Sequence, residues 1–375
     1  MRKGDKRNRM QRLVFITVTD GYFFPGTLAT IHSIRAFHPK ARVLVVHNHI
    51  HKRPLLAAQR QVLESAGACV VDAAQLAKPG RKLAAWELKA YAASDLTGDD
   101  DVLVGIDSDC ILCGPIDDLI ASAKKSGRFH GGKDGGGPIY DQSYDVYGIQ
   151  TPVHNHSYIS ASLYVCALTD GNRRILQKWA DACDKAIFGG GKIYPGHGDQ
   201  GVLNAVIWAE RPGGKGVQPL DNRIWSQHHC YWQAPVSVRA GRLFNDRANI
   251  YQRSIHCGGG EKFWTLKHRE RVEREGLQAS CYAWFLTMLW FGLARVGPEH
   301  LLPDQVHLVE SLIRFRWEVT DFFPAIREMR RLTPGNAFGE LATAPDPSGK
   351  HRSQNGHSPE SAGRPTTLPA SKQPA

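Results

Sequence analysis

The stretch Asp101-Val102-Leu103-Val104-Gly105-Ile106-Asp107-Ser108-Asp109 decides the fold of this chain. Its apolar and β-branched residues predict a buried strand of the kind found in parallel sheets. Side chains two apart on an extended chain face the same side, so Asp107 and Asp109 can approach one ligand together. Open α/β sheets bind ligands at the carboxyl ends of their strands, where two carboxylates suit a hard divalent cation.

A chance loop explains an Asp-x-Asp pair about as well as a metal site does, when the pair is taken alone. The chain contains a second such pair, Asp99 and Asp101, in a Gly-Asp-rich turn before the apolar run. We interpret that second pair as a solvated loop. Only Asp107 and Asp109 follow a buried strand.

Composition predicts a soluble globular protein with one large or two ordinary domains in its 375 residues. The net charge of +11 favours an anionic partner, which could be a nucleotide, a phosphate-bearing substrate, an acidic lipid surface or nucleic acid. The apolar run 13–18 is too short for a signal peptide or a membrane span, so we expect a cytoplasmic protein. Eight scattered cysteines are interpreted as reduced thiols.

Alternating strand and helix patterns predict an α/β fold with a mostly parallel central sheet flanked by helices. Asp199 lies near the start of one predicted helix, where helix capping is the plain alternative to a catalytic role. The glycine-rich stretch 130–137 lacks the spacing of a phosphate loop and reads as a loop over a site or as a linker. The predicted strands span residues 13–18, 42–47, 69–71, 102–106, 158–167 and 253–256, and the predicted helices 24–36, 54–66, 83–94 and 172–186, with one more after Asp199.

The C-terminal part predicts a helical segment. Residues 282–294 are almost wholly apolar but shorter than the ~20 residues of a spanning helix, which favours a buried helix. Residues 306–332 form a basic amphipathic pair that either packs on the catalytic domain, the favoured interpretation, or lies on the inner face of a membrane. We expect a basic disordered N-terminus (1–12), a catalytic domain (13–270), a helical extension (271–333) and a disordered tail (334–375).

Five segments, in order, resemble glycosyltransferase family 8, the retaining group with a GT-A fold that includes glycogenin and bacterial lipopolysaccharide galactosyltransferases. They are residues 18–22, 82–91, 107–109 and 198–204, and the spacing of His256, Gly259, Lys262 and Trp264. The resemblance covers residues 13–266. It implies a GT-A type nucleotide-diphospho-sugar transferase fold.

The resemblance also implies roles for individual residues. Asp107, Asp109 and His256 would hold Mn²⁺, or Mg²⁺ in its place. Asp199 and Gln200 would face the donor sugar as catalytic residues. Tyr22 would stack on uracil, and Lys82 and Lys262 would contact the diphosphate or the sugar. The full set of implied donor and nucleotide contacts is Thr19, Asp20, Tyr22, Lys82, Ser108, Ser160, Ser162, Gly259 and Lys262.

Two positions depart from the family pattern. Ser160-Ala161-Ser162 stands where the family usually has Asn-Ser-Gly, which leaves the identity of the donor sugar open. Phe263 stands where proline is usual. His256 alone would be interpreted as a structural histidine, but the glycines after it permit close backbone approach to a ligand.

The implied reaction moves a sugar from a UDP-sugar to an acceptor hydroxyl with retention at the anomeric carbon. Front-face attack with the leaving phosphate as base is preferred, and a transient adduct on Asp199 stays open. The acceptor would be a glycan, a lipid-linked molecule or a protein, and no nucleic-acid partner is expected.

Two alternatives differ in class. A nucleotidyltransferase should carry a Gly-rich loop with Arg or Lys after its first strand, where this chain has residues 20–24. A non-catalytic basic protein that binds membrane or nucleic acid would leave the Asp107, Asp109 and His256 set unexplained.

Overall fold

The computed structural model describes residues 12–47, 53–76, 85–134, 154–188, 198–225, 236–258, 261–275, 279–296, 298–315 and 322. Several predictions fall outside these ranges. They include Lys82, Gly259, the N-terminus up to residue 11, the predicted tail and residues 135–137 of the glycine-rich stretch. The prediction of a loop or linker over residues 130–137 was wrong for residues 130–133, which belong to the strand Phe129–Lys133 of the central sheet.

In the described part of the chain, seven strands form the central sheet in the order β3-β2-β1-β4-β7-β6-β8. Four strand pairs are parallel, β1 with β2, β1 with β4, β2 with β3 and β6 with β8, whereas β7 runs antiparallel to both β4 and β6. The predicted mostly parallel sheet is therefore confirmed. The strands are β1 (Leu13–Thr19), β2 (Arg42–His47), β3 (Cys69–Asp72), β4 (Val102–Ile106), β6 (Phe129–Lys133), β7 (Ile159–Ala167) and β8 (Val217–Leu220).

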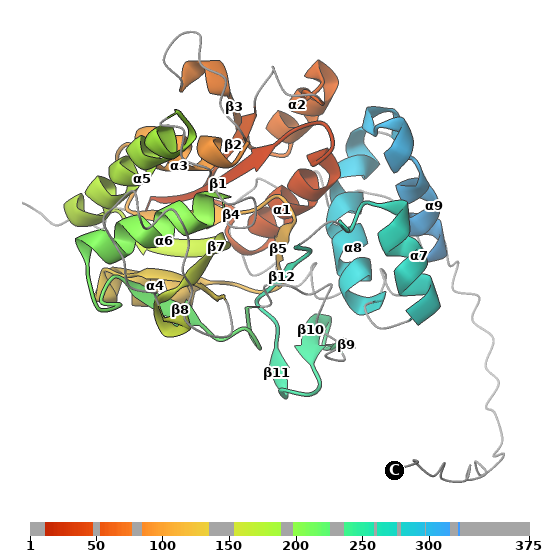
Figure 1. Ribbon diagram of the computed structural model, residues 1–375. Helices are drawn as coiled ribbons and strands as arrows, with labels where there is room; N and C mark the ends of the chain where they lie inside the picture. The colour runs from red at the N-terminus through yellow and green to blue at the C-terminus, as the bar shows by residue number, and fades with distance from the viewer. Residues whose placement is uncertain are drawn as a thin grey trace, which may run out of the picture. The chain divides into compact units, whose positions relative to one another are not determined.

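Helices cover both faces of this sheet (Figure 1). Alternate residues of β1 face opposite layers, since Phe15 joins one hydrophobic cluster and Val14 and Ile16 join the other. The first cluster contains side chains of α1 (Phe24–Phe37), α2 (Ala57–Ser65) and α4 (Asp117–Ser126), and the second those of α3 (Ala85–Asp95), α5 (Asp170–Phe188) and α6 (Gly198–Glu210). Burial of each large apolar side chain contributes about 1.5–3 kcal/mol.

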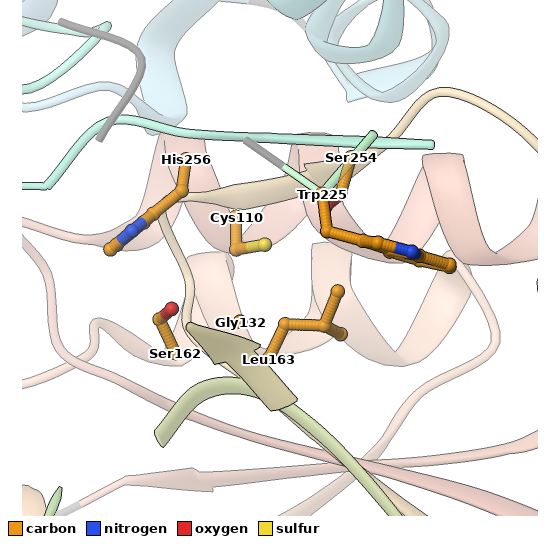
Figure 2. Close-up of a pocket in the computed structure, with 7 residues that line it drawn as sticks. All are labelled: Cys110, Gly132, Ser162, Leu163, Trp225, Ser254 and His256. Atoms are coloured by element: carbon orange, nitrogen blue, oxygen red, sulfur yellow. The ribbon is translucent and has the colours of Figure 1, made fainter. Parts of the chain in front are cut away.

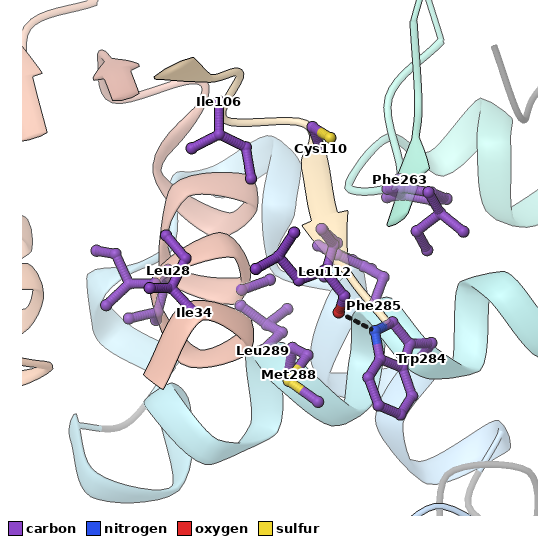
Figure 3. Close-up of a cluster of buried hydrophobic side chains, with 14 of the residues drawn as sticks. Leu28, Ile34, Ile106, Cys110, Leu112, Phe263, Trp284, Phe285, Met288 and Leu289 are labelled. Atoms are coloured by element: carbon purple, nitrogen blue, oxygen red, sulfur yellow. Dashed lines mark hydrogen bonds between the residues drawn. The ribbon is translucent and has the colours of Figure 1, made fainter. Parts of the chain in front are cut away.

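The C-terminal helices extend the first cluster. Helix α8 (Ala279–Val296) packs on α1, and a Cβ added to Gly292 would fall 2.5 Å from the Leu28 side chain. The Trp284 indole donates a hydrogen bond to the carbonyl of Leu112 at 2.9 Å, as Figure 3 shows. The predicted buried helix over 282–294 is confirmed, and among the described residues no helix has the length and hydropathy to cross a membrane.

Two shorter helices flank α8, namely α7 (Leu266–Glu275) and α9 (His307–Arg314). Leu308 of α9 is buried, and Tyr282 of α8 donates a hydrogen bond to Ser311 of α9 at 3.0 Å. Helix α9, which lies within the predicted basic amphipathic segment 306–332, therefore packs on α8. Arg316, Arg327, Arg330 and Arg331 lie outside the described residues.

Two small sheets complete the fold. Strands β9 (Val236–Arg239), β10 (Arg242–Asn245) and β11 (Ile250–Tyr251) form an antiparallel meander, and β5 (Cys110–Leu112) pairs with β12 (Ser254–His256). The sequence pattern did not predict β5, β6, β8, β9, β10 or β11. The prediction that residues 107–109 are extended was wrong, because Ser108 and Asp109 form a turn in which the Cys110 amide donates to the Asp107 carbonyl at 2.9 Å.

Candidate functional site

Asp107, Asp109 and His256 meet at the end of the central sheet. Each offers one ligand atom, and these atoms lie within 4.8 Å of one another. Asp107 directly follows strand β4, and Asp109 lies in the turn after it. The pairing of β5 with β12 places His256 opposite Cys110. A backbone hydrogen bond from Cys257 to the Asp109 carbonyl, 2.9 Å long, closes the arrangement. The short β5 strand thus joins two segments that are distant in sequence.

This group of ligand atoms fits a divalent cation. Two carboxylates and one imidazole form a donor set that Mn²⁺ and similar ions accept. His256 Nε2 lies 3.2 Å from Asp109 Oδ1. Burial alone would lower the pKa of His256, but the Asp109 carboxylate outweighs burial and raises it.

Two lysines contact the same carboxylates. Lys262 Nζ pairs with Asp109 Oδ2, and Lys89 Nζ pairs with Asp107 Oδ1 and lies 3.3 Å from Asp199 Oδ2. Burial opposes the charge on each group, yet the opposite charges prevail: the pKa of Asp109 is well below its usual range and those of both lysines are raised. The site therefore alternates negative and positive groups, an arrangement suited to a ligand that carries several anionic oxygens.

Lys89 is a site residue that the sequence analysis missed. The prediction assigned the lysine of this helix to Lys82, which lies outside the described residues. Lys89 lies in α3, seven positions after Lys82 in the sequence. The sequence offered one signal for Lys89. This lysine follows an apolar residue, Leu88, which is buried, and it lies on a predicted helix that leads to the strand before Asp107.

Asp199 and Gln200 lie in the first turn of α6. Burial raises the pKa of Asp199, and the nearby Lys89 partly offsets this effect. Gln200 Oε1 accepts a hydrogen bond from the Ala161 amide at 3.1 Å, and Gln200 Nε2 donates to Asp134 at 2.6 Å. The Gln200 amide thus ties α6 to β7 and to the residue that follows β6.

The two serines of β7 lie beside this cluster. Ser160 and Ser162 are buried and share a hydrogen bond of 2.8 Å between their hydroxyls. The Ser162 carbonyl accepts a hydrogen bond from the Asp107 amide at 2.8 Å. In Figure 2, Ser162 and His256 lie on one side of Cys110, and Trp225 lies on the other side. The small pocket between them is lined by Cys110, Gly132, Ser162, Leu163, Trp225, Ser254 and His256.

Thr19 and Asp20 shape the turn between β1 and α1. Asp20 Oδ1 accepts a hydrogen bond from the Phe23 amide at 2.8 Å, which holds the start of the helix. Thr19 Oγ1 accepts a hydrogen bond from the Thr27 hydroxyl at 2.6 Å. Both contacts are local, so they fix the backbone that presents Tyr22.

Tyr22 stands beside the lysine of the charged cluster. Its ring centroid lies 5.3 Å from that of Phe23 and 5.8 Å from that of Trp264, in edge-on contacts. Lys262 Nζ lies 5.7 Å from the Phe23 ring centroid while it contacts Asp109. The turn that carries Tyr22 and the Asp109 carboxylate therefore flank the same ammonium group.

Phe263 and Trp264 anchor Lys262. Phe263, which stands where the family pattern has proline, is fully buried and stacks on Phe285 with a centroid distance of 5.3 Å. A Cβ on Gly26 would fall 2.1 Å from the Trp264 ring and 2.3 Å from the Ser108 carbonyl oxygen. Only glycine permits this approach of α1 to the turn of Asp109.

No protein-family model and no curated protein matches this chain. Among solved structures, the chain is similar to the bifunctional glycosyltransferase WbbM in its apo form, with 13% identity over 75% of this chain and 50% of that chain and a TM-score of 0.48. The chain is also similar to the galactosyltransferase LgtC in complex with donor and acceptor sugar analogues. The identity is 16% over 70% of this chain and 94% of that chain, and the TM-score is 0.44. A third similar structure is the apo form of the glycosyltransferase GlyE of Streptococcus pneumoniae TIGR4. The identity is 13% over 68% of this chain and 56% of that chain, and the TM-score is 0.43. The chain thus spans half of the WbbM chain.

Proposed function

We propose that the chain is a metal-dependent glycosyltransferase with a GT-A type fold, similar to family 8, that transfers a sugar from a UDP-sugar to an acceptor hydroxyl with retention. The observation that carries the proposal is the convergence of Asp107, Asp109 and His256 between two lysines. The leaving group of such a reaction is a diphosphate, and its charge is stabilised where cations gather.

Asp107, Asp109 and His256 would hold Mn²⁺, or Mg²⁺ in its place. The cation would supply Lewis-acid stabilisation of the diphosphate oxygens and a template for the donor. Asp109 and His256 are buried, so their positions are fixed before a donor binds.

The lysines and the Tyr22 turn would bind the nucleotide. Lys262, between Asp109 and the Phe23 ring, would contact the diphosphate, and Tyr22 would stack on uracil. Thr19 and Asp20 hold this turn in place. Ser108, Lys82 and Gly259 complete the proposed donor contacts.

The sugar would lie near Asp199 and β7. In the proposed step the bond between the anomeric carbon and the diphosphate oxygen breaks, and its electron pair stays on that oxygen. The acceptor oxygen attacks from the same face and its proton passes to the departing phosphate. Lys89 favours the charged form of Asp199, which would orient the sugar. Gln200 holds β7, and Ser160 and Ser162 would stand near the sugar hydroxyls. An adduct on Asp199 is the alternative route.

We further propose that residues 13–270 form the catalytic domain and 271–333 a helical extension, in a cytoplasmic protein. The acceptor would be a glycan, a lipid-linked molecule or a protein, and the C-terminal helices would provide any peripheral membrane contact.

The test is UDP release from UDP-glucose and UDP-galactose with Mn²⁺, with Mg²⁺ and with a chelator. The proposal predicts release that needs the metal and that Asp109→Ala abolishes. Asp99→Ala is the matched control, because Asp99 belongs to the other Asp-x-Asp pair and its side chain is 80% exposed. Equal release by Asp109→Ala and wild type, or no turnover of any nucleotide sugar, would contradict the proposal. Pyrophosphate release from nucleoside triphosphates would instead indicate a nucleotidyltransferase.

A further inference from the structure

A buried glutamine of the C-terminal extension contacts the turn that carries Tyr22. Gln305 belongs to the short helix η6 (Pro303–Gln305), and 1% of its surface is exposed. Gln305 Nε2 donates a hydrogen bond to the Tyr22 carbonyl at 2.9 Å, although the two residues are 283 positions apart. Gln305 Oε1 accepts a hydrogen bond from the Leu302 amide at 3.1 Å. One side chain therefore caps its own helix and reaches into the catalytic domain.

Gln59 makes the reciprocal contact from the catalytic domain. Its side chain is fully buried, and its Oε1 accepts a hydrogen bond from the Leu56 amide at 3.1 Å at the start of α2. Gln59 Nε2 donates to the carbonyl of His300, in the neighbouring helix η5 (Pro298–His300), at 2.9 Å. Two glutamines with the same use of their amides thus join the extension to the first part of the chain.

The segment beside Gln59 closes the turn from the other side. The Gly21 amide donates to the Arg53 carbonyl at 2.8 Å, and a Cβ on Gly21 would lie 2.9 Å from the Pro54 carbonyl oxygen. Arg53 also pairs with Asp304 at 3.3 Å, but both side chains are about half exposed, so this ion pair adds little. The backbone of residues 21 and 22 is therefore held between residue 53 and Gln305.

We propose that Gln305 is a positioning residue for the nucleotide base, so that the C-terminal extension forms part of the donor-binding site. The inference rests on the proposed function, in which Tyr22 stacks on uracil. The Gln305 amide is buried and donates to the Tyr22 carbonyl, so it fixes the Tyr22 peptide and thereby the direction of the Tyr22 ring. A ring held in place before binding loses less conformational entropy when the base stacks on it.

The proposal assigns the base and the diphosphate of the nucleotide to different residues of the site. Gln305 contacts the Tyr22 turn, whereas Asp107 and Asp109 lie in the segment between β4 and β5 and His256 lies in β12. Removal of the Gln305 amide should therefore weaken binding of UDP but leave binding of inorganic pyrophosphate with Mn²⁺ unchanged.

The experiment compares Gln305→Leu with Gln59→Leu by titration calorimetry with Mn²⁺ and either UDP or pyrophosphate. Both variants lose a buried amide and a contact with the extension, but Gln59→Leu retains the Gln305 hydrogen bond to Tyr22. We expect Gln305→Leu to weaken UDP binding about five- to tenfold, with pyrophosphate binding within twofold of wild type. Gln59→Leu should weaken UDP binding less than Gln305→Leu. Equal UDP affinity in Gln305→Leu and wild type, or an equal loss for both ligands, overturns the inference.

A second measurement uses the ligand-free protein. Amide hydrogen exchange over residues 20–23 should be faster in Gln305→Leu than in wild type, and unchanged exchange overturns the inference even where UDP binds normally. Gln305→Glu serves if Gln305→Leu does not fold, because a carboxylate still accepts from Leu302 but cannot donate to Tyr22. If the wild type does not bind UDP, the proposed function fails, and the nucleotide role of Gln305 fails with it. If the wild type binds UDP and Gln305→Leu binds it equally well, only the inference about Gln305 fails.

Discussion

The substitution Lys89→Met tests the charged cluster most severely. Lys89 is 4% exposed and lies between Asp107 and Asp199, whose side chains are 34% and 17% exposed. Removal of one partner from a buried ion pair costs about 3–5 kcal/mol, because the other charge stays buried without compensation. Partial exposure lets water resolvate Asp107, so we expect a loss near the lower end, about 3 kcal/mol of the free energy of unfolding. Methionine keeps most of the apolar stem, so little of this loss comes from packing.

The same substitution should change metal binding in the opposite direction. The Lys89 ammonium pairs with Oδ1 of Asp107, one of the proposed metal ligands, and its positive charge repels a cation. At an effective dielectric constant near 20, two unit charges about 5 Å apart interact by about 3 kcal/mol. Lys89→Met should therefore bind Mn²⁺ at least about tenfold more tightly than wild type, while turnover of a UDP-sugar falls.

The assay is urea unfolding followed by tryptophan fluorescence, with and without Mn²⁺. Lys178→Met is the control, because Lys178 is about half exposed in its pair with Glu210 and should contribute about 0.5 kcal/mol. Mn²⁺ should restore much of the lost stability in Lys89→Met, since a ligand that binds the native state stabilises it. A loss below about 1 kcal/mol for Lys89→Met, or Mn²⁺ affinity equal to that of wild type, would refute the described arrangement.

Three further predictions concern the fold. Burial lowers the pKa of His130 to about 4, so below the unfolded value of about 6.5 the unfolded state binds more protons. Through this group the free energy of unfolding should fall by about 2 kcal/mol between pH 7 and 4.5. Denaturant titrations should show that this fall is smaller by about 2 kcal/mol in His130→Gln than in wild type. Gly105→Ala should prevent soluble expression or lower the Tm strongly, because its Cβ would lie 2.0 Å from the Tyr164 ring. Trp284→Phe should lose about 1–3 kcal/mol in urea unfolding, because the buried Leu112 carbonyl loses its donor; a change within 0.5 kcal/mol would contradict this role.

The sequence predicted five of the seven described strands of the central sheet, because strand and helix patterns are local, and it missed β6 and β8. The run before Asp107 is apolar over its whole length, and β4 is fully buried there. The same pattern could not show that β7 is antiparallel to β4, since all nine residues of β7 are buried and a continuous apolar run carries no direction. It also missed β5, which has only three residues.

The candidate site was predictable only in part. Asp107 and Asp109 followed from their place after a strand, but His256 followed from its resemblance to a family motif. Its position depends on the pairing of β5 with β12, which no local pattern reveals. Lys89 was missed because lysine is rarely buried, and a buried lysine is recognised only from its carboxylate partners. The contact of Gln305 with Tyr22 spans 283 positions and required the fold.

The most direct test of the proposed site is electron paramagnetic resonance of Mn²⁺ bound to the purified protein, with and without UDP. The proposed ligands predict one bound Mn²⁺ per chain, a nitrogen coupling that disappears in His256→Gln, and a change in the Mn²⁺ spectrum on addition of UDP. A wild-type protein that binds no Mn²⁺, or a nitrogen coupling that persists in His256→Gln, would contradict a metal site formed by Asp107, Asp109 and His256.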